Sequence, residues 1–293
     1  MDLVDALPKA ELHVHLEGTL EPEQMMYLAQ RNNVLDQIPY DSVEEVRKAY
    51  DFKDLQSFLD LYYAGCAVLL EQQDFYDLTW AYLERAHAEG VVHVEPFFDP
   101  QTHTQRNVPF GTAVKGVHAA LKDAEAKWGM TSGIIICFLR HLGPEAALEC
   151  LEEALLFKDM IMGVGLDSTE IGWPNKLFTE AFTRAKAEGF RLVAHAGEEG
   201  PAENVHQALA LGVQRVDHGI HSLEDPDLLK QLAERRMPLT LCPLSNLKLK
   251  VYDGELQERM QELFGLGNLC ITVNSDDPAY FGGYMSLQLT TEL

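Results

Sequence analysis

The chain has 293 residues, of which 46% are hydrophobic, and its 46 acidic and 23 basic side chains give a formal net charge of -23. A surface this acidic repels nucleic-acid backbones and anionic membranes, so we expect neither nucleic acid nor a membrane as a partner. No apolar run of about 18 residues occurs, and the five scattered cysteines form no C-x-x-C pair, which is typical of free thiols in a reducing compartment and predicts a cytoplasmic protein.

Short apolar runs that end in polar or charged residues recur along the chain, and each is typical of a fully buried strand. The eight runs cover residues 11–16, 91–98, 133–139, 162–166, 191–196, 215–219, 237–241 and 269–273. Amphipathic segments, such as residues 201–211 and 226–235, lie between most of them. Strands that alternate with helices predict a parallel α/β fold, and the number eight favours a closed TIM (β/α)8 barrel, which we expect to form one domain over residues 1–293.

Two stretches depart from this regular alternation. Residues 19–90 are too many for one connection between a strand and a helix, and residues 21–31, 43–50, 52–72 and 75–89 look like separate helices. We therefore predict a helical insertion after the first strand, which forms a cap near the barrel mouth. Only residues 275–293 follow the eighth strand, so we expect the final helices of the barrel to be missing and residues 285–293 to depart from a helical continuation.

Polar residues that can bind a metal follow several of the predicted strands, at the end where a barrel holds its active site. The first strand ends in His13 and His15, which point to the same side because they are two residues apart. His195 ends the fifth strand, His218 ends the sixth, and Asp276 follows the eighth. Three of these four histidines and the aspartate, converging in this way, predict a catalytic zinc site, with one position left open for water.

Each of these features taken alone has a simpler interpretation. An H-x-H pair in a strand is more often structural, and adjacent aspartates before a proline usually make a turn or a helix cap. Together they place buried charges where nonpolar residues would be less costly, which favours the metal site. His93 and Glu95 form an H-x-E pair, but the P-C-x-x-C half of one zinc deaminase signature is absent, so we reject that fold. His103 and His141, just past the second and third strands, are candidates for the pocket lining.

Five segments, PKAELHVHLEGTL, VAHAGEEG, VDHGIHS, LCPLSNLKL and VNSDDPAYFGGY, resemble the motifs of the adenosine/adenine deaminase family, a branch of the metal-dependent amidohydrolases. The resemblance covers nearly the whole chain, and the motifs keep the family order. It implies that one zinc ion (Zn2+) is bound by four side chains, namely His13, His15, His195 and Asp276. Residues 165–170 contain no lysine, the residue that usually bridges two metals there, so we expect one metal, although Glu170 leaves a bridging carboxylate open.

The same resemblance implies roles for the residues around the metal in the hydrolytic deamination of a purine. Glu198 would donate a proton to N1, His218 would orient and help deprotonate the water, Asp277 would hydrogen-bond N7, and Ser168 would offer its backbone N–H to the ring. Zinc lowers the pKa of bound water from 15.7 towards roughly 7, so that hydroxide can attack C6. This attack pushes electron density onto N1, so Glu198 must start protonated and burial should raise its pKa.

The residue after the H-x-H-L stretch bears on the choice of purine. In adenosine-specific relatives this residue is commonly an aspartate that contacts the ribose, whereas here it is Glu17. One extra methylene would carry the carboxylate into the space that a ribose needs, although Glu17 could instead serve only in packing. Residues 97–103 and 277–284 also look like the adenine branch. We therefore expect adenine to be deaminated to hypoxanthine and ammonia, as in purine salvage.

Other functions are kept as alternatives. Adenosine or an N6-substituted adenine would use the same chemistry on a different purine. A barrel hydrolase of amides, lactones or phosphoesters would share the metal but not the pair of Glu198 and Asp277. A truncated paralogue could bind purines without catalysis. The sequence does not specify the oligomeric state.

Overall fold

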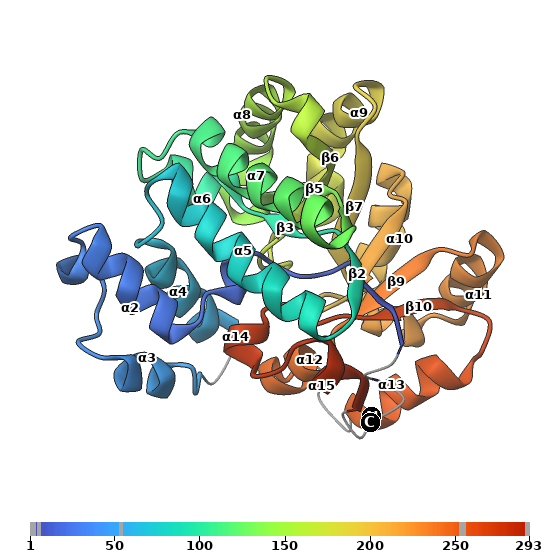
Figure 1. Ribbon diagram of the computed structural model, residues 1–293. Helices are drawn as coiled ribbons and strands as arrows, with labels where there is room; N and C mark the ends of the chain where they lie inside the picture. The colour runs from blue at the N-terminus through green and yellow to red at the C-terminus, as the bar shows by residue number, and fades with distance from the viewer. Residues whose placement is uncertain (1–3, 5–6, 53–54, 252–255, 291–293) are drawn as a thin grey trace.

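Parallel strands form the centre of the computed structural model, which describes residues 4, 7–52, 55–251 and 256–290 (Figure 1). The strands are β1 (Lys9–Glu11), β2 (Val91–Val94), β3 (Phe97–Phe98), β4 (Thr131–Ser132), β5 (Ile134–Leu139), β6 (Ile161–Asp167), β7 (Arg191–Ala196), β8 (Arg215–His218), β9 (Pro238–Leu241) and β10 (Cys270–Val273). They form one sheet in the order β10-β9-β8-β7-β6-β5-β3 and another in the order β1-β2-β4. Single parallel bridges from Val14 to Asp276 and from His15 to Phe97 join the two sheets. The predicted closed barrel is therefore confirmed.

The predicted strands overlap the observed ones, with two differences near the start of the chain. The regular part of the first strand ends at Glu11, and residues 14 and 15 make only single bridges. The second predicted strand is divided into β2 and β3 around Pro96. Proline has no backbone N–H to donate, so it interrupts the regular pattern of hydrogen bonds.

Helices surround the barrel and cover one part of its mouth. They are α2 (Pro22–Arg31), α3 (Val43–Ala49), α4 (Leu55–Cys66), α5 (Gln72–Ala88), α6 (Pro100–Thr104), α7 (Phe110–Trp128), α8 (Gly143–Leu155), α9 (Thr179–Ala187), α10 (Ala202–Leu211), α11 (Pro226–Arg235), α12 (Pro243–Leu249), α13 (Leu256–Gly265), α14 (Pro278–Phe281) and α15 (Met285–Thr290). Among the described residues, no helix has both the length and the apolar character that crossing a membrane requires.

The helical insertion after the first strand is present, but its extent differs from the prediction. The helices α2, α3 and α4 form the cap, whereas α5 packs against α7 and β2 on the outside of the barrel (Figure 1). The side chains of Phe75, Leu78 and Tyr82 are buried at a spacing of three and four residues, so α5 presents one apolar stripe to the barrel. The last of the four predicted cap helices is therefore the first outer helix of the barrel.

The residues after β10 also differ from the prediction. We expected residues 285–293 to depart from a helical continuation, but Met285–Thr290 is the helix α15, and residues 291–293 lie outside the described residues. The helix α15 contacts β10, and its Met285 and Gln288 are buried. The Gln288 side chain accepts a hydrogen bond from Leu244 N and donates one to Gly283 O, which anchors the short helix. The four residues of β10 remain only half-buried.

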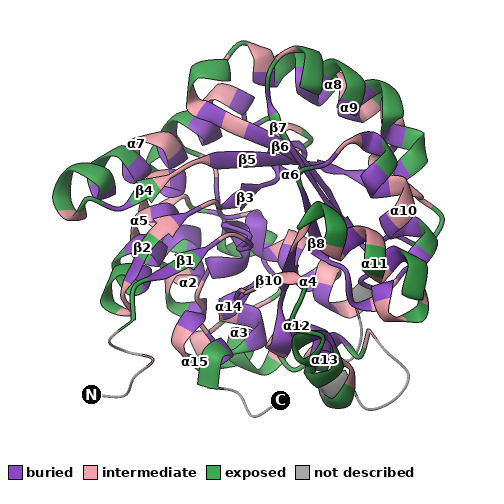
Figure 2. Cartoon of the chain, turned by 90° about the vertical axis from the view of Figure 1, so that its right-hand side faces the viewer, coloured by how far each residue is buried: buried purple, intermediate pink, exposed green. Residues whose placement is uncertain are grey.

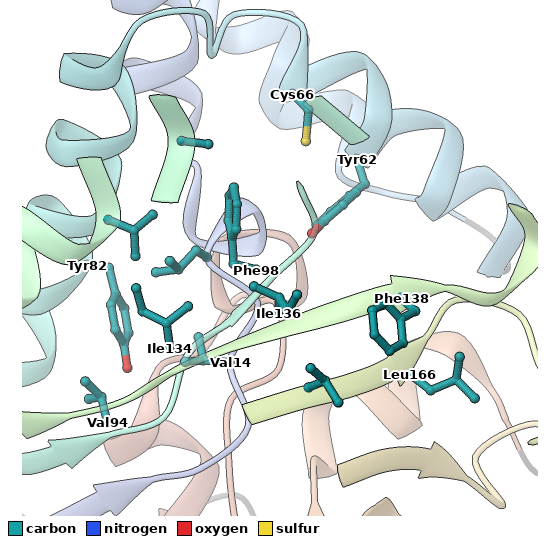
Figure 3. Close-up of a cluster of buried hydrophobic side chains, with 14 of the residues drawn as sticks. Val14, Tyr62, Cys66, Tyr82, Val94, Phe98, Ile134, Ile136, Phe138 and Leu166 are labelled. Atoms are coloured by element: carbon teal, nitrogen blue, oxygen red, sulfur yellow. The ribbon is translucent and has the colours of Figure 1, made fainter. Parts of the chain in front are cut away.

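Side chains of the barrel strands alternate between two apolar layers. Ile134, Ile136 and Phe138 of β5 point away from the barrel axis into the large cluster beneath the outer helices (Figure 3). Ile135 and Cys137, the residues between them, pack inside the barrel with Phe97 and Val193. Figure 2 shows the result, with buried strands enclosed by helices that are exposed on their outer faces. Phe97 of this inner layer contacts the rings of His13, His15 and His195.

Candidate active site

The residues that follow β1 and β10 hold each other by backbone hydrogen bonds at the barrel mouth. His15 N donates to Asp276 O at 2.9 Å, and Asp276 N donates to His13 O at 3.1 Å. Asp276 has a φ of 64°, in the left-handed region that non-glycine residues rarely adopt. Ser168 and His218, two other predicted site residues, share this conformation with φ values of 70° and 65°. Such backbone strain is typical of functional sites, because it persists only where the surrounding structure enforces it.

The four predicted metal ligands converge on one point. His15 Nε2 lies 3.2 Å from His195 Nε2, and Asp276 Oδ1 lies 3.3 Å from His13 Nε2 and 3.5 Å from His15 Nε2. Zinc bonds to nitrogen and oxygen of about 2.0–2.1 Å in a tetrahedron would separate neighbouring ligand atoms by about 3.3–3.4 Å. His13 Nε2 is buried and has no hydrogen-bond partner among the described residues. These side chains therefore fit a single zinc ion.

A chain of hydrogen bonds orients the His13 ring. The Thr240 hydroxyl donates to Asp217 Oδ1 at 2.9 Å, so its oxygen accepts from His13 Nδ1, which is 2.8 Å away. Arg215 in turn donates to both Asp217 and Glu95. Because Nδ1 carries the proton, Nε2 keeps its lone pair for a metal. Glu95 of the H-x-E pair therefore belongs to this support, which sequence reasoning did not identify.

Glu198 and His218 lie next to each other beside the ligand set. His218 Nε2 is 3.6 Å from Glu198 Oε2 and 3.9 Å from Asp276 Oδ2. Burial raises the pKa of Glu198 to about 8, although His218 acts in the opposite direction. Burial alone would lower the pKa of His218, but the carboxylates of Glu198, Asp276 and Asp217 outweigh it and raise that pKa. A carboxyl group with a raised pKa therefore lies beside an imidazole whose pKa is also raised.

Glu170 was the one residue in the sequence that could have bridged a second metal ion, but its side chain points away from the ligand set. Both oxygens of its carboxylate accept hydrogen bonds from the loop of residues 197–200, and one also accepts from Asn204. Burial raises the pKa of Glu170, but the charge of Arg140 and these donors outweigh it and lower that pKa. The carboxylate is therefore occupied within the protein, which argues against a metal bridge at this position.

A second wall of the site is rich in carboxyl groups that the sequence analysis did not single out. Asp99 and Asp167 carry side-chain oxygens that lie within 4.8 Å of each other and of a His15 nitrogen. Burial, together with the charges of the neighbouring carboxylates, raises the pKa of Asp99 to about 8 and that of Asp167 well above its usual value. Asp99 follows the second predicted strand and Asp167 follows the fourth. The strand-end rule that identified the histidines would have found both.

Glu17 lies behind this wall. Its carboxylate accepts hydrogen bonds from His103 Nε2 at 2.8 Å and from Asp99 N at 3.2 Å, and burial raises its pKa to about 7. His103 is fully buried and also contacts Arg106, so it does not line the cavity as the sequence suggested. Glu17 is likewise absent from the cavity lining. The extra methylene therefore carries the carboxylate towards Asp99 and His103.

The cavity at the barrel mouth is enclosed by strand ends, the cap helix α4 and α12. Its lining residues are His15, Phe58, Leu59, Tyr62, Tyr63, Asp99, Leu139, Asp167, Ser168, His195, Glu198, His218, Leu249, Asp276 and Asp277. Most of the predicted site residues are thus brought together, while His13 lies behind the others. The Ser168 hydroxyl lies 2.8 Å from His141 Nδ1, which places His141 next to the lining.

Asp277 depends on a glycine at the start of the cap. A Cβ atom at residue 18 would collide with the Asp277 carboxyl group, so Gly18 makes room for it. Asp277 Oδ1 has no hydrogen-bond partner among the described residues, although it is buried. Burial and the neighbouring Asp276 raise the pKa of Asp277 well above its usual value. The Asp277 side chain is thus one that a ligand in the cavity can satisfy.

Comparisons with known proteins agree over nearly the whole chain. Residues 8–292 match the family model described as Adenosine deaminase. An adenine deaminase from Psychrobacter cryohalolentis is 54% identical over 287 residues, which make up 98% of this chain and 86% of that protein. Another from Acinetobacter baylyi is 55% identical over 286 residues, or 97% of this chain and 85% of that protein.

Two solved structures extend this agreement to the fold. The adenine deaminase from Arthrobacter aurescens matches with a TM-score of 0.93 at 48% identity, covering 97% of this chain and 86% of that chain. An amidohydrolase from Burkholderia ambifaria with bound Zn matches with a TM-score of 0.89 at 30% identity, covering 99% of this chain and 81% of that chain. The chain described here belongs to the adenosine deaminase family.

Proposed function

We propose that the protein is a zinc-dependent adenine deaminase, which converts adenine and water to hypoxanthine and ammonia. The observation that carries the proposal is the position of Glu198, a buried acid with a pKa raised to about 8, beside His218 and the four-residue ligand set. The names of the relatives from Psychrobacter and Acinetobacter favour adenine, and the Zn in the Burkholderia structure favours zinc. The proposed ligands are His13, His15, His195 and Asp276.

The residues around the ligands divide the proton transfers between them. When bound, zinc would supply the nucleophile near neutral pH by lowering the pKa of a water molecule. His218 would orient that water and accept its proton. Glu198 would donate its proton to N1 of the purine as electron density moves there from C6. The proton that His218 took from the water would then move to the exocyclic nitrogen, which leaves as ammonia, while the proton of the C6 hydroxyl would return to Glu198 as the C6 carbonyl forms.

Purine binding is assigned to residues on both sides of the cavity. Asp277, with its raised pKa, would donate a hydrogen bond to N7, and Ser168 would offer its backbone N–H to the ring. Glu17 would act through Asp99, whose backbone N–H it holds. The Oδ1 atoms of Asp99 and Asp167 have no hydrogen-bond partner among the residues that the structure describes, and both side chains line the cavity, so these atoms would accept from N–H groups of a free base. Adenosine has no N–H at N9, so this wall favours adenine over the nucleoside.

The test is hypoxanthine formation by purified, zinc-loaded protein from adenine, adenosine and an N6-substituted adenine in parallel. We expect the highest kcat/KM for adenine, and loss of activity on chelation with recovery when zinc is restored. The variant Asp276→Asn, which keeps the shape but removes a charged ligand, should lose both zinc and activity. Faster turnover of adenosine would overturn the substrate assignment. A zinc-loaded protein that deaminates none of the three, or that instead hydrolyses esters, would overturn the proposed function.

The cellular setting of the enzyme is proposed on chemical grounds. Deamination of adenine to hypoxanthine is a step suited to purine salvage. The cysteines Cys66, Cys137, Cys150, Cys242 and Cys270 are all unpaired in the described structure, which favours a reducing compartment such as the cytoplasm.

A further inference from the structure

One buried carboxylate collects the backbone N–H groups of a whole loop. Glu170 Oε2 accepts from Glu198 N at 2.9 Å, Glu199 N at 3.2 Å and Gly200 N at 3.0 Å. Glu170 Oε1 accepts from Gly197 N at 3.0 Å and from the Asn204 side chain at 2.9 Å. Successive N–H groups that converge on one anion form a nest, and they hold the loop in a single conformation. The loop held in this way carries Glu198.

The loop needs its two glycines to reach the carboxylate. Gly197 has a φ of 66°, in the left-handed region. A Cβ atom at Gly200 would lie 2.9 Å from Glu170 Oε1 and would also collide with the Asn204 side chain. The backbone therefore approaches Glu170 more closely than other residues would permit.

A reciprocal contact joins the same two segments. Glu199 Oε1 accepts hydrogen bonds from Glu170 N at 2.7 Å and from the Thr169 hydroxyl at 2.6 Å. Each segment thus supplies one carboxylate to the backbone of the other. Of these two carboxylates, it is that of Glu170 that contacts the N–H of Glu198.

Arg140 fixes the position of this pair of segments on the barrel. Its guanidinium donates to His195 O at 2.7 Å and to Asp167 O at 3.0 Å, which joins the carboxyl ends of β7 and β6. It also donates to Asn175 Oδ1 at 2.7 Å, and Asn175 donates to Asn204 O. Arg140 is fully buried, and its charge helps to keep Glu170 ionised.

We propose that Glu170 is a positioning residue that holds the loop of residues 197–200 so that the Glu198 carboxyl group faces the reacting purine. This inference rests on the proposed function, in which Glu198 is the proton donor. Glu170 itself has no role in metal binding, since its oxygens are occupied by the loop. A displacement of about 1 Å in a reacting group can lower a rate about 10²-fold, so the effect of losing this contact is measurable.

The test begins with Glu170→Gln, which keeps the size of the side chain but leaves one oxygen for the five donors. We expect kcat for adenine to fall about 10–100-fold, with KM within about threefold of the wild type and an unchanged zinc content. The matched control is Glu199→Gln, which makes the same change in the reciprocal contact. We expect its kcat to stay within about threefold of the wild type. Equal losses in the two variants would show that Glu170 serves only to join the segments.

A double-mutant cycle with Glu198→Gln separates positioning from general damage. If Glu170 acts through Glu198, Glu170→Gln should lower kcat less than about threefold once Glu198 has been replaced. The same loss in both backgrounds, or a loss of zinc, would overturn the inference. If Glu170→Gln does not fold, Glu170→Asp replaces it, because aspartate keeps both oxygens but cannot reach the loop. A wild-type kcat for that variant would also overturn the inference. Failure of the wild type on adenine would instead count against the proposed function.

Discussion

A buried glutamate lies behind each of two walls of the active site, and the two glutamates differ in pKa. On the wall formed by β6 and β7, Glu170 is 3% exposed, and the charge of Arg140 together with hydrogen-bond donors lowers its pKa against the effect of burial. On the wall formed by the residues after β1 and β3, Glu17 is fully buried, and its pKa is raised to about 7. Both glutamates are buried, so the neighbouring charge of Arg140 and the number of hydrogen-bond donors, rather than burial, decide which carboxylate stays ionised.

The two walls also differ in whether their carboxyl groups support the protein structure or can bind a ligand. The carboxylate of Glu170 is used within the protein, where it holds the loop that carries Glu198. On the opposite wall, Asp99 lines the cavity, as does Asp167 at the end of β6, and the Oδ1 atoms of both are buried without hydrogen-bond partners among the described residues. Unpartnered buried oxygens are costly, so such a wall is suited to a ligand that brings its own N–H groups. The first wall positions the proton donor, and the second is available to the substrate.

The largest expected effect is at the proton donor. Glu198→Gln removes the acidic proton while keeping the size of the side chain, so we expect kcat/KM for adenine to fall about 10²–10⁴-fold. Steady-state kinetics on zinc-loaded protein measures the loss, and zinc content is the control. A variant that keeps wild-type kcat/KM would show that the first wall does not supply the proton.

The pH dependence of the reaction gives the next effect. Glu198 must be protonated in the free enzyme, and its pKa is raised to about 8, so kcat/KM should fall as pH rises through about 8. Above that value the slope approaches about tenfold per pH unit. Kinetics between pH 6 and pH 10 tests this expectation. The low activity that remains in Glu198→Gln should not show this decrease, and a decrease of the same size there would assign it to another group.

Replacing Glu170 or Glu17 by glutamine allows the two walls to be compared by the change in the free energy of unfolding. Glu170→Gln removes an ionised acceptor from five donors, so we expect the free energy of unfolding at pH 7 to fall by about 3 kcal/mol. Glu17→Gln should cost less than about 1 kcal/mol, because Glu17 is near its pKa and glutamine resembles the protonated form. Urea unfolding at equal zinc saturation measures both. Equal decreases in the free energy of unfolding for the two variants would contradict the contrast between the walls.

The last expected effect concerns Asp99 and the dependence of stability on pH. Its pKa is raised to about 8 in the folded state, so between about pH 4 and pH 8 the folded protein holds a proton that the unfolded chain has released. This group therefore makes the free energy of unfolding decrease as pH rises, by at most about 1.4 kcal/mol per pH unit. Asp99→Asn cannot titrate and should have a smaller slope between pH 5 and pH 8. Urea unfolding of the variant and the wild type at several pH values measures the two slopes. Equal slopes of the free energy of unfolding against pH would contradict the expectation.

The sequence by itself was enough for the features that depend on short-range patterns. Apolar runs such as residues 191–196 and 215–219 predict buried strands because a strand enclosed on both faces needs apolar side chains at almost every position. The rule that strand ends meet at one face of a barrel then brings His13, His15, His195 and Asp276 together. This reasoning was applied to histidines and overlooked Asp99 and Asp167, which follow strands in the same way.

Only the tertiary structure decided the features that depend on contacts between distant residues. Nothing local in α5 distinguishes a cap helix from a barrel helix, because the same apolar stripe can pack on either. The side-chain direction of Glu17 depends on His103, which lies 86 residues later in the chain. Glu170 could have been a metal ligand by its position, but the loop 27–30 residues further on supplies the donors that occupy it. The charge and the role of a buried carboxylate are set by its partners, and a linear sequence does not state which partners fold against it.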